Sequence, residues 1–153
     1  MSERQIAVYN QFRNAQDKYT YFLLAAAGAA VALVVRETAT AALTWSQVPL
    51  AAAVLSWGLS FYCGCRHLTL MASSLYSNFE LLNVYAGENP VAGKNPEIIA
   101  ILAAAIQNGI NANSSRTERF GKMQFEFLIS GAIFYIGWHV WEMWLRTPHA
   151  LLK

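Results

Sequence analysis

Charged residues are scarce in this chain. Only 13% of its 153 residues are Asp, Glu, Lys or Arg, and 56% are hydrophobic, whereas about 25% of the residues in a soluble domain are charged. Uncharged residues form three long blocks, 19–35, 38–65 and 127–141. A bilayer core requires about 20 mostly apolar helical residues. The sequence therefore predicts an all-α, polytopic membrane protein, a single membrane domain over residues 1–153.

Cysteine and histidine are also few, and their spacing does not favour a metal site. Cys63, Cys65 and His67 alternate along a predicted helix, where such residues point about 200° apart and cannot converge on one zinc ion. A haem would need two facing histidines, but His67 and His139 are expected at opposite membrane faces. We therefore expect no metal and no cofactor.

Catalytic motifs are lacking as well. The sequence has no Gly-rich phosphate loop, nucleophile elbow, HExxH motif or paired carboxylates. The net charge of +2 is too small to favour nucleic acid as a partner. We expect a non-enzymatic protein whose partners are the lipid bilayer and further copies of itself.

The predicted segments follow from the apolar blocks and the helix breakers. An amphipathic N-terminal helix, 1–18, leads without a break into a first span, and eighteen polar-rich residues before that span argue against a signal peptide. A cytoplasmic antiparallel helical hairpin separates the second and third spans. The predicted boundaries are 19–36 (first span), 48–65 (second span), 66–122 (hairpin), 123–146 (third span) and 147–153 (tail).

The hairpin prediction depends on one helix continuing past the membrane and on a strong breaker. The second span continues through RHLTLMASSLYSNFELLNVY to about residue 85, with an apolar stripe of Leu68, Met71, Leu75, Phe79 and Leu82. AGENPVAGKNP then breaks the helix, and Asn95 and Pro96 begin the next one. Its apolar stretch 98–106 is too short to span a membrane, so we expect it to pack against 68–85. A polar joint, NANSSRTER, precedes the third span, and no heptad run is evident.

Basic residues set the expected topology. They cluster before the first span and between the second and third: Arg4, Arg13, Lys18, Arg66, Lys94, Arg116, Arg119 and Lys122. Because basic residues stay on the cytoplasmic side, we expect the N-terminus inside and the C-terminus outside, in a bacterial inner membrane.

The stretch GWHVWEMWLR holds three tryptophans at the end of the third span. Tryptophan and tyrosine concentrate at the membrane–water boundary. We interpret Trp138, Trp141 and Trp144, together with Tyr19 and Tyr21 at the start of the first span, as interface anchors.

A polar stripe runs along the same span, through Gln124, Tyr135, His139, Glu142 and Arg146. One interpretation is a pore lining or buried polar stripe, because ionisable groups within a membrane seldom face lipid. The other is that Glu142 and Arg146 pair in the headgroup region and merely end the helix. Arg116, Arg119 and Lys122 likewise have two interpretations, contact with anionic lipid or binding of an anionic ligand.

The N-terminal layout supports one resemblance. SERQIAVYNQFRNAQDKYTYF enters a membrane hairpin, and the second span continues as a cytoplasmic helix. Over residues 1–85 this resembles small bacterial membrane effectors of the SLATT type. The resemblance implies a pore-forming role in nucleotide-signalled antiviral defence, although the third span departs from the two-span plan.

The sequence leaves three functions open. The first is a homo-oligomeric pore-forming or membrane-perturbing effector. The second is an accessory or anchoring subunit that docks on a cytoplasmic protein partner through its hairpin. The third, with least support, is a membrane enzyme or a quinone- or haem-site protein.

Overall fold

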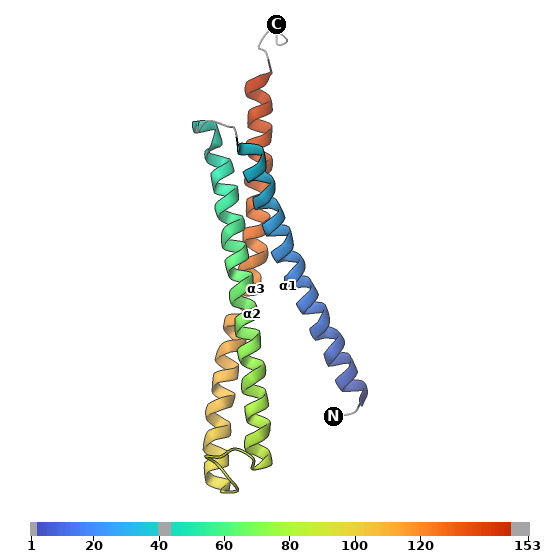
Figure 1. Ribbon diagram of the computed structural model, residues 1–153, viewed down its shortest axis with the longest axis vertical. Helices are drawn as coiled ribbons and strands as arrows, with labels where there is room; N and C mark the ends of the chain where they lie inside the picture. The colour runs from blue at the N-terminus through green and yellow to red at the C-terminus, as the bar shows by residue number, and fades with distance from the viewer. Residues whose placement is uncertain (1–2, 40–43, 148–153) are drawn as a thin grey trace. The chain divides into compact units, whose positions relative to one another are not determined.

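The structure, a computed structural model, describes residues 3–39 and 44–147, and the side chains of all of these except residues 3–6, 9 and 12. Three long helices make up almost all of the described chain: α1 (Glu3–Thr38), α2 (Val48–Ala86) and α3 (Pro96–Arg146). A short 3-10 helix, η1 (Trp45–Gln47), precedes α2 (Figure 1). The described residues contain no strand, so the chain is all-helical there.

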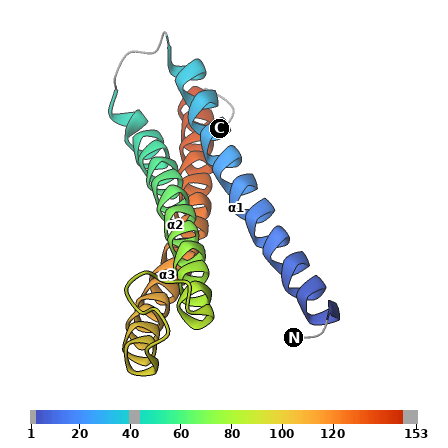
Figure 2. The same cartoon turned by 60° about the horizontal axis from the view of Figure 1, so that its bottom comes forward.

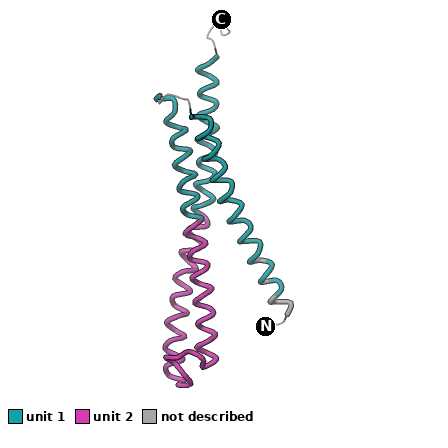
Figure 3. Tube along the Cα trace, viewed as in Figure 1, with its two compact units in different colours: residues 1–64, 123–153 teal, residues 65–122 magenta. Residues whose placement is uncertain are grey.

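The helices divide between two compact units (Figure 3). Unit 1 contains residues 1–64 and 123–153, and unit 2 contains residues 65–122. Both α2 and α3 pass from one unit into the other as continuous helices. The polar joint expected at NANSSRTER lies within the continuous helix α3, because polar residues on an exposed helix face do not interrupt backbone hydrogen bonds.

Unit 1 packs α1 against the first part of α2 and the last part of α3 (Figures 1 and 2). Its apolar cluster consists of Val34, Leu50, Ala53 and Trp57. Leu128, Tyr135 and Trp138 of α3 pack against this cluster. Among the described side chains of α1, burial begins at Thr20 and continues at Leu23, Ala27 and Val34. Among the small residues of this stretch, only Ala27 is buried. Ala25, Gly28, Ala29 and Ala32 are exposed, so the packing face of α1 consists mainly of larger side chains.

Unit 2 consists of the α2 arm (65–86), a loop, and the α3 arm (96–122). Val84, Ala92 and Ala103 form its buried cluster, against which Leu81, Ile99, Leu102 and Ile106 pack. Gly87, at φ +73°, ends α2 with hydrogen bonds from Gly87 N to Val84 O and from Glu88 N to Asn83 O, a Schellman ending. The Asn95 side chain caps α3 by accepting the Glu97 amide at 3.0 Å.

Two helices of the described residues are long and apolar enough to cross a membrane, at Arg13–Thr38 and Trp45–Ala86. These contain the first and second expected spans. The expected third span is not among them. Its segment includes Glu126, His139 and Glu142 among tryptophans and glycines, which lowers its mean hydropathy.

Candidate functional site

A buried polar node joins the three helices in the middle of unit 1. Gln124 of α3 is only 1% exposed, and its Nε2 donates to the Thr20 carbonyl oxygen of α1 at 3.4 Å. Ser60 of α2, fully buried, donates from Oγ to the Gln124 carbonyl oxygen at 2.7 Å. A Cβ at Gly64 would lie 2.5 Å from Gln124 Nε2, so the glycine makes room for the amide. The node fixes the register of the helices.

An aromatic column continues from this node along α3. Trp57 of α2 donates from Nε1 to the Leu128 carbonyl oxygen at 3.2 Å, and its ring lies against Gly131. The Trp57 and Tyr135 ring centroids are 5.8 Å apart, and Tyr135 stacks on His139 at 6.4 Å. These separations fall in the range of favourable aromatic pairs. Packing in this column positions the Tyr135 hydroxyl next to α1.

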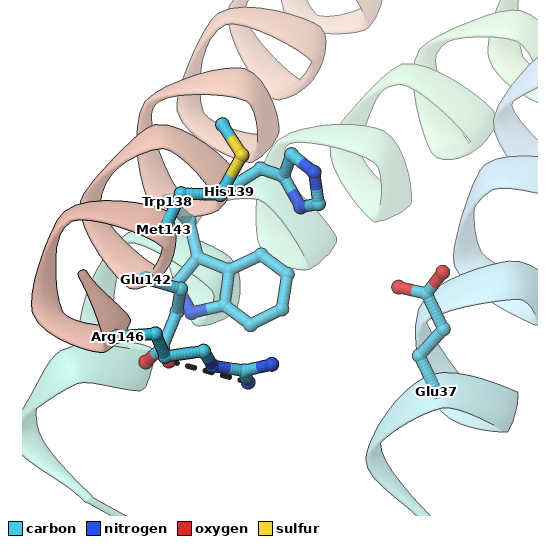
Figure 4. Close-up of a pocket in the computed structure, with 6 residues that line it drawn as sticks. All are labelled: Glu37, Trp138, His139, Glu142, Met143 and Arg146. Carbon is cyan, nitrogen blue, oxygen red and sulfur yellow. Dashed lines mark hydrogen bonds and ion pairs between the residues drawn. The ribbon is translucent and has the colours of Figure 1, made fainter. Parts of the chain in front are cut away.

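Tyr135 connects the column to a carboxylate on α1. Its hydroxyl donates to Glu37 Oε2 at 3.1 Å. Glu37 then forms one wall of a pocket of about 260 Å³ whose other lining residues are Trp138, His139, Glu142, Met143 and Arg146. Figure 4 shows the Glu37 carboxylate across the pocket from the α3 residues. Two carboxylates, an imidazole and a guanidinium thus meet at the ends of α1 and α3.

One ion pair lies within this pocket. Arg146 Nη2 is 3.5 Å from Glu142 Oε2, and the Glu142 side chain is 19% exposed whereas that of Arg146 is 79% exposed. The Trp138 indole nitrogen is buried without a hydrogen-bond partner. The pocket can offer carboxylate acceptors and imidazole and guanidinium donors to water, ions or protons.

The polar stripe expected from the sequence therefore separates into two places. Tyr135, His139, Glu142 and Arg146 meet around the pocket, with Glu37 added from α1. Gln124 belongs to the buried node, where its amide contacts α1. In this arrangement Gln124 positions helices and does not face the pocket.

The expected anchors also occupy different surroundings. Trp141 and Trp144 face outward, 54% and 65% exposed, as do Tyr19 and Tyr21 at 52% and 60%. Trp138 instead packs against the apolar cluster of unit 1 and lines the pocket. The arc of three tryptophans thus begins inside the bundle and ends on its surface.

The basic residues Arg116, Arg119 and Lys122 are all exposed, on the α3 arm of unit 2. In the same unit, Arg66 of the α2 arm lies over the Phe120 ring, 6.0 Å from its centroid. His67 donates from Nδ1 to the Thr117 carbonyl oxygen at 2.9 Å, since a carbonyl can only accept.

Sequence reasoning missed the contributions of Glu37, Ser60 and Trp57. The sequence pattern assigns Glu37 to a loop, yet α1 continues to Thr38 and places its carboxylate beside Tyr135. A signal in the sequence was that an acidic residue follows the uncharged block 19–35 with only Arg36 between them. Trp57 in the middle of a span was a second signal, because an indole N–H away from water needs a partner.

Comparisons with known proteins do not assign the chain to a family. It matches no protein-family model, no curated protein and no solved structure. The function of the chain is therefore inferred from its sequence and from the geometry of the described residues.

Proposed function

We propose that the chain is an integral membrane protein with three transmembrane helices. The supporting observation is the apolar surface of unit 1. Only 22% and 33% of the most apolar windows of α1 and α2 are buried, whereas a core helix of a soluble protein is mostly buried. The last part of α3 exposes a similar surface, including Ile133, Ile136 and Val140 at 64%, 61% and 53%. Apolar patches this extensive are rare on soluble monomers, and lipid would cover them.

The proposed topology follows the basic residues. The N-terminus and the hairpin of unit 2 lie in the cytoplasm, and the C-terminus lies outside, in a bacterial inner membrane. Arg66, Arg116 and Arg119 would then be on the cytoplasmic side, where anionic lipids attract basic residues. The pocket between Glu37 and Arg146 would be near the outer face.

Within that topology, the function that the geometry supports best is a homo-oligomeric pore or membrane-perturbing effector. The observation that carries this proposal is the pocket formed by Glu37, His139, Glu142 and Arg146 on otherwise apolar helices. Ionisable groups in membrane segments mark ion or proton paths far more often than lipid-facing surfaces. Three helices enclose no lumen, so several copies are needed. The resemblance to SLATT-type effectors would place such a pore in bacterial defence.

A permeability assay tests this proposal. Cells expressing the wild type should admit a small impermeant dye. Glu142→Ala, His139→Ala and Glu37→Ala should each slow dye entry by about tenfold or more, because charge-lined paths concentrate ions by that order. Glu118→Ala, at an exposed position of the α3 arm, is the matched control and should behave as wild type. Equal dye entry in all five strains would contradict a pore lined by this pocket.

A second candidate is an accessory subunit that docks on a larger cytoplasmic protein. The observation that favours it is the exposed apolar surface of the α2 arm, with Phe79 59% and Leu82 66% exposed. This candidate predicts one copy of the chain bound to a different protein after mild detergent extraction. A complex made only of this chain would exclude it.

A further inference from the structure

The α2 arm has an unusual distribution of polar and apolar residues. Toward the α3 arm it places serines: Ser73 Oγ accepts from Asn113 Nδ2 at 3.4 Å, and Ser74 Oγ is buried without a partner. Away from the α3 arm it places large apolar residues, Leu75, Phe79 and Leu82, at 40%, 59% and 66% exposure. An isolated helical pair in water would have the opposite distribution.

The outward residues follow a regular spacing. We define the outer face of the α2 arm as Cys65, Leu68, Ala72, Leu75, Phe79, Leu82 and Ala86. Leu68 is partly exposed and the other six are exposed. Their separations alternate between three and four residues, as do the a and d positions of three consecutive heptads followed by the next a position, and all seven are apolar. This 3.5-residue period is the pattern of a left-handed coiled coil. It is inconspicuous in the sequence because Cys65, Ala72 and Ala86 are small.

The opposite face of the same arm is already occupied. Leu70 and Val84, 9% and 0% exposed, lie seven residues on either side of Ser77 and face the interior of unit 2. The α3 arm cannot also cover the outer face. Of the large apolar residues of the α3 arm, all of which are described, Ile98 and Ile101 are the exposed ones, and both lie in its first two turns.

We propose that the outer face pairs with the same face of a second copy of the chain, as a parallel, in-register coiled coil. This inference rests on the proposed membrane insertion and homo-oligomerisation. Both copies insert through the N-terminal part of α2 into one membrane, and α2 is one continuous helix, so the two arms must run in the same direction.

The flanking positions agree with self-pairing. The e and g positions of this register are Thr69, Tyr76, Asn83, Met71, Asn78 and Tyr85. None is charged, so two identical faces meet without repulsion between like charges. If charge selected a different protein as the partner, the e and g positions would carry charged residues. Ala72 opposite Ala72 of the second copy would bring the two helices close together.

Cross-linking with the chain's own cysteines tests the pairing. Cys65 is exposed on the outer face, and Cys63 is buried on the other side of the helix. In membranes treated with a mild oxidant, Cys63→Ser should give a disulfide-linked dimer, because a parallel pair places the two Cys65 α-carbons within about 4.4–6.8 Å. Cys65→Ser should give none.

A second pair of cysteines extends the test away from the membrane. In a background lacking both native cysteines, Leu75→Cys should cross-link and Ser115→Cys, exposed on the α3 arm, should not. Equal cross-linking at both positions, or none at Leu75→Cys and Cys65, would overturn the proposal. A cross-link from Leu75→Cys to a different protein, or to the chain's own N-terminal helix, would also overturn it.

A matched pair of charge substitutions probes the surface directly. Ala72→Glu and Ala112→Glu change the same residue at exposed helix positions, one on the outer face and one on the α3 arm. Ala72→Glu buries two like charges in the pair and should lower the cross-linked fraction of the Cys63→Ser protein about tenfold or more. Ala112→Glu should leave it unchanged, and an equal loss in both would contradict the assigned face.

The outcome is separable from that of the pore proposal. Cross-linking that depends on Ala72, in cells that admit no dye, would support the coiled coil and contradict the pore proposal. Dye entry that depends on Glu142, with no cross-linking through Cys65 or Leu75→Cys, would support the pore and contradict pairing through the outer face.

Discussion

At the residue scale, two glycines determine how closely the helices of unit 1 approach. A Cβ at Gly64 would lie 2.7 Å from Leu24 Cδ2 of α1, and one at Gly131 would overlap the Trp57 ring. Gly58 and Gly137, on the same two helices, have nothing within 4 Å of an added Cβ. The contrast separates glycines that permit packing from glycines that face open space.

Gly131→Ala should therefore destabilise unit 1 by about 1–3 kcal/mol, the usual range for overpacking. Gly137→Ala should be neutral or stabilise α3 by up to about 1 kcal/mol, since alanine is the better helix former. The free energy of unfolding in mixed detergent micelles, followed by circular dichroism, would measure both. Equal effects of the two substitutions would contradict the close contact between Trp57 and Gly131.

The hydrogen bond between Tyr135 and Glu37 allows a second test at this scale. Tyr135→Phe, Glu37→Ala and the double variant form a double-mutant cycle, because each single change removes one partner of the hydrogen bond. We expect a coupling of about 0.6 kcal/mol, typical of side-chain hydrogen bonds in membranes. Tyr62→Phe is the control, because the Tyr62 side chain is 57% exposed and its hydroxyl makes no side-chain hydrogen bond with the described residues. A coupling near zero would show that α1 and α3 do not meet at this bond.

At the scale of elements, the ends of the helices were more predictable than their packing faces. The sequence predicts a helix from about 49 to 85, and α2 runs from Val48 to Ala86. Pro49, Gly87 and the Asn-Pro pairs are local signals, so no tertiary information was needed. The continuity of α3 through NANSSRTER could not be foreseen in that way, because polarity there reflects exposure and leaves the helix intact.

The capping of α3 by Asn95 yields a prediction at this scale. Asn95→Ala removes the acceptor of the Glu97 amide and should destabilise the first turn by about 1 kcal/mol. Hydrogen exchange of the amides of residues 97–99 should accelerate roughly fivefold. Asn108→Ala, at an exposed mid-helix position, should slow exchange slightly or leave it unchanged, and faster exchange there would argue against capping as the cause.

At the scale of the whole molecule, the proposed membrane insertion explains why the packing faces of the helices are hard to predict from the sequence. Lipid-facing and helix-facing surfaces are both apolar, so periodicity alone does not distinguish them. Trp138 and Trp141 look equivalent in the sequence, yet one packs inside unit 1 and the other is 54% exposed. Gln124 similarly looks like part of one stripe with His139, but the contacts with Thr20 and Ser60 give it a separate role.

The central claim is that all three helices cross a membrane, and the third crossing is the one that composition supports least. The most direct measurement is the labelling of single cysteines in intact cells with a membrane-impermeant maleimide, in a background lacking Cys63 and Cys65. We predict that Thr44→Cys and Thr147→Cys react from outside, whereas Lys94→Cys reacts only after the membrane is opened. Protection of both Lys94→Cys and Thr147→Cys would contradict a third span. Labelling of all three in intact cells would contradict crossings by both α2 and α3, and protection of all three until the membrane is opened would contradict every crossing.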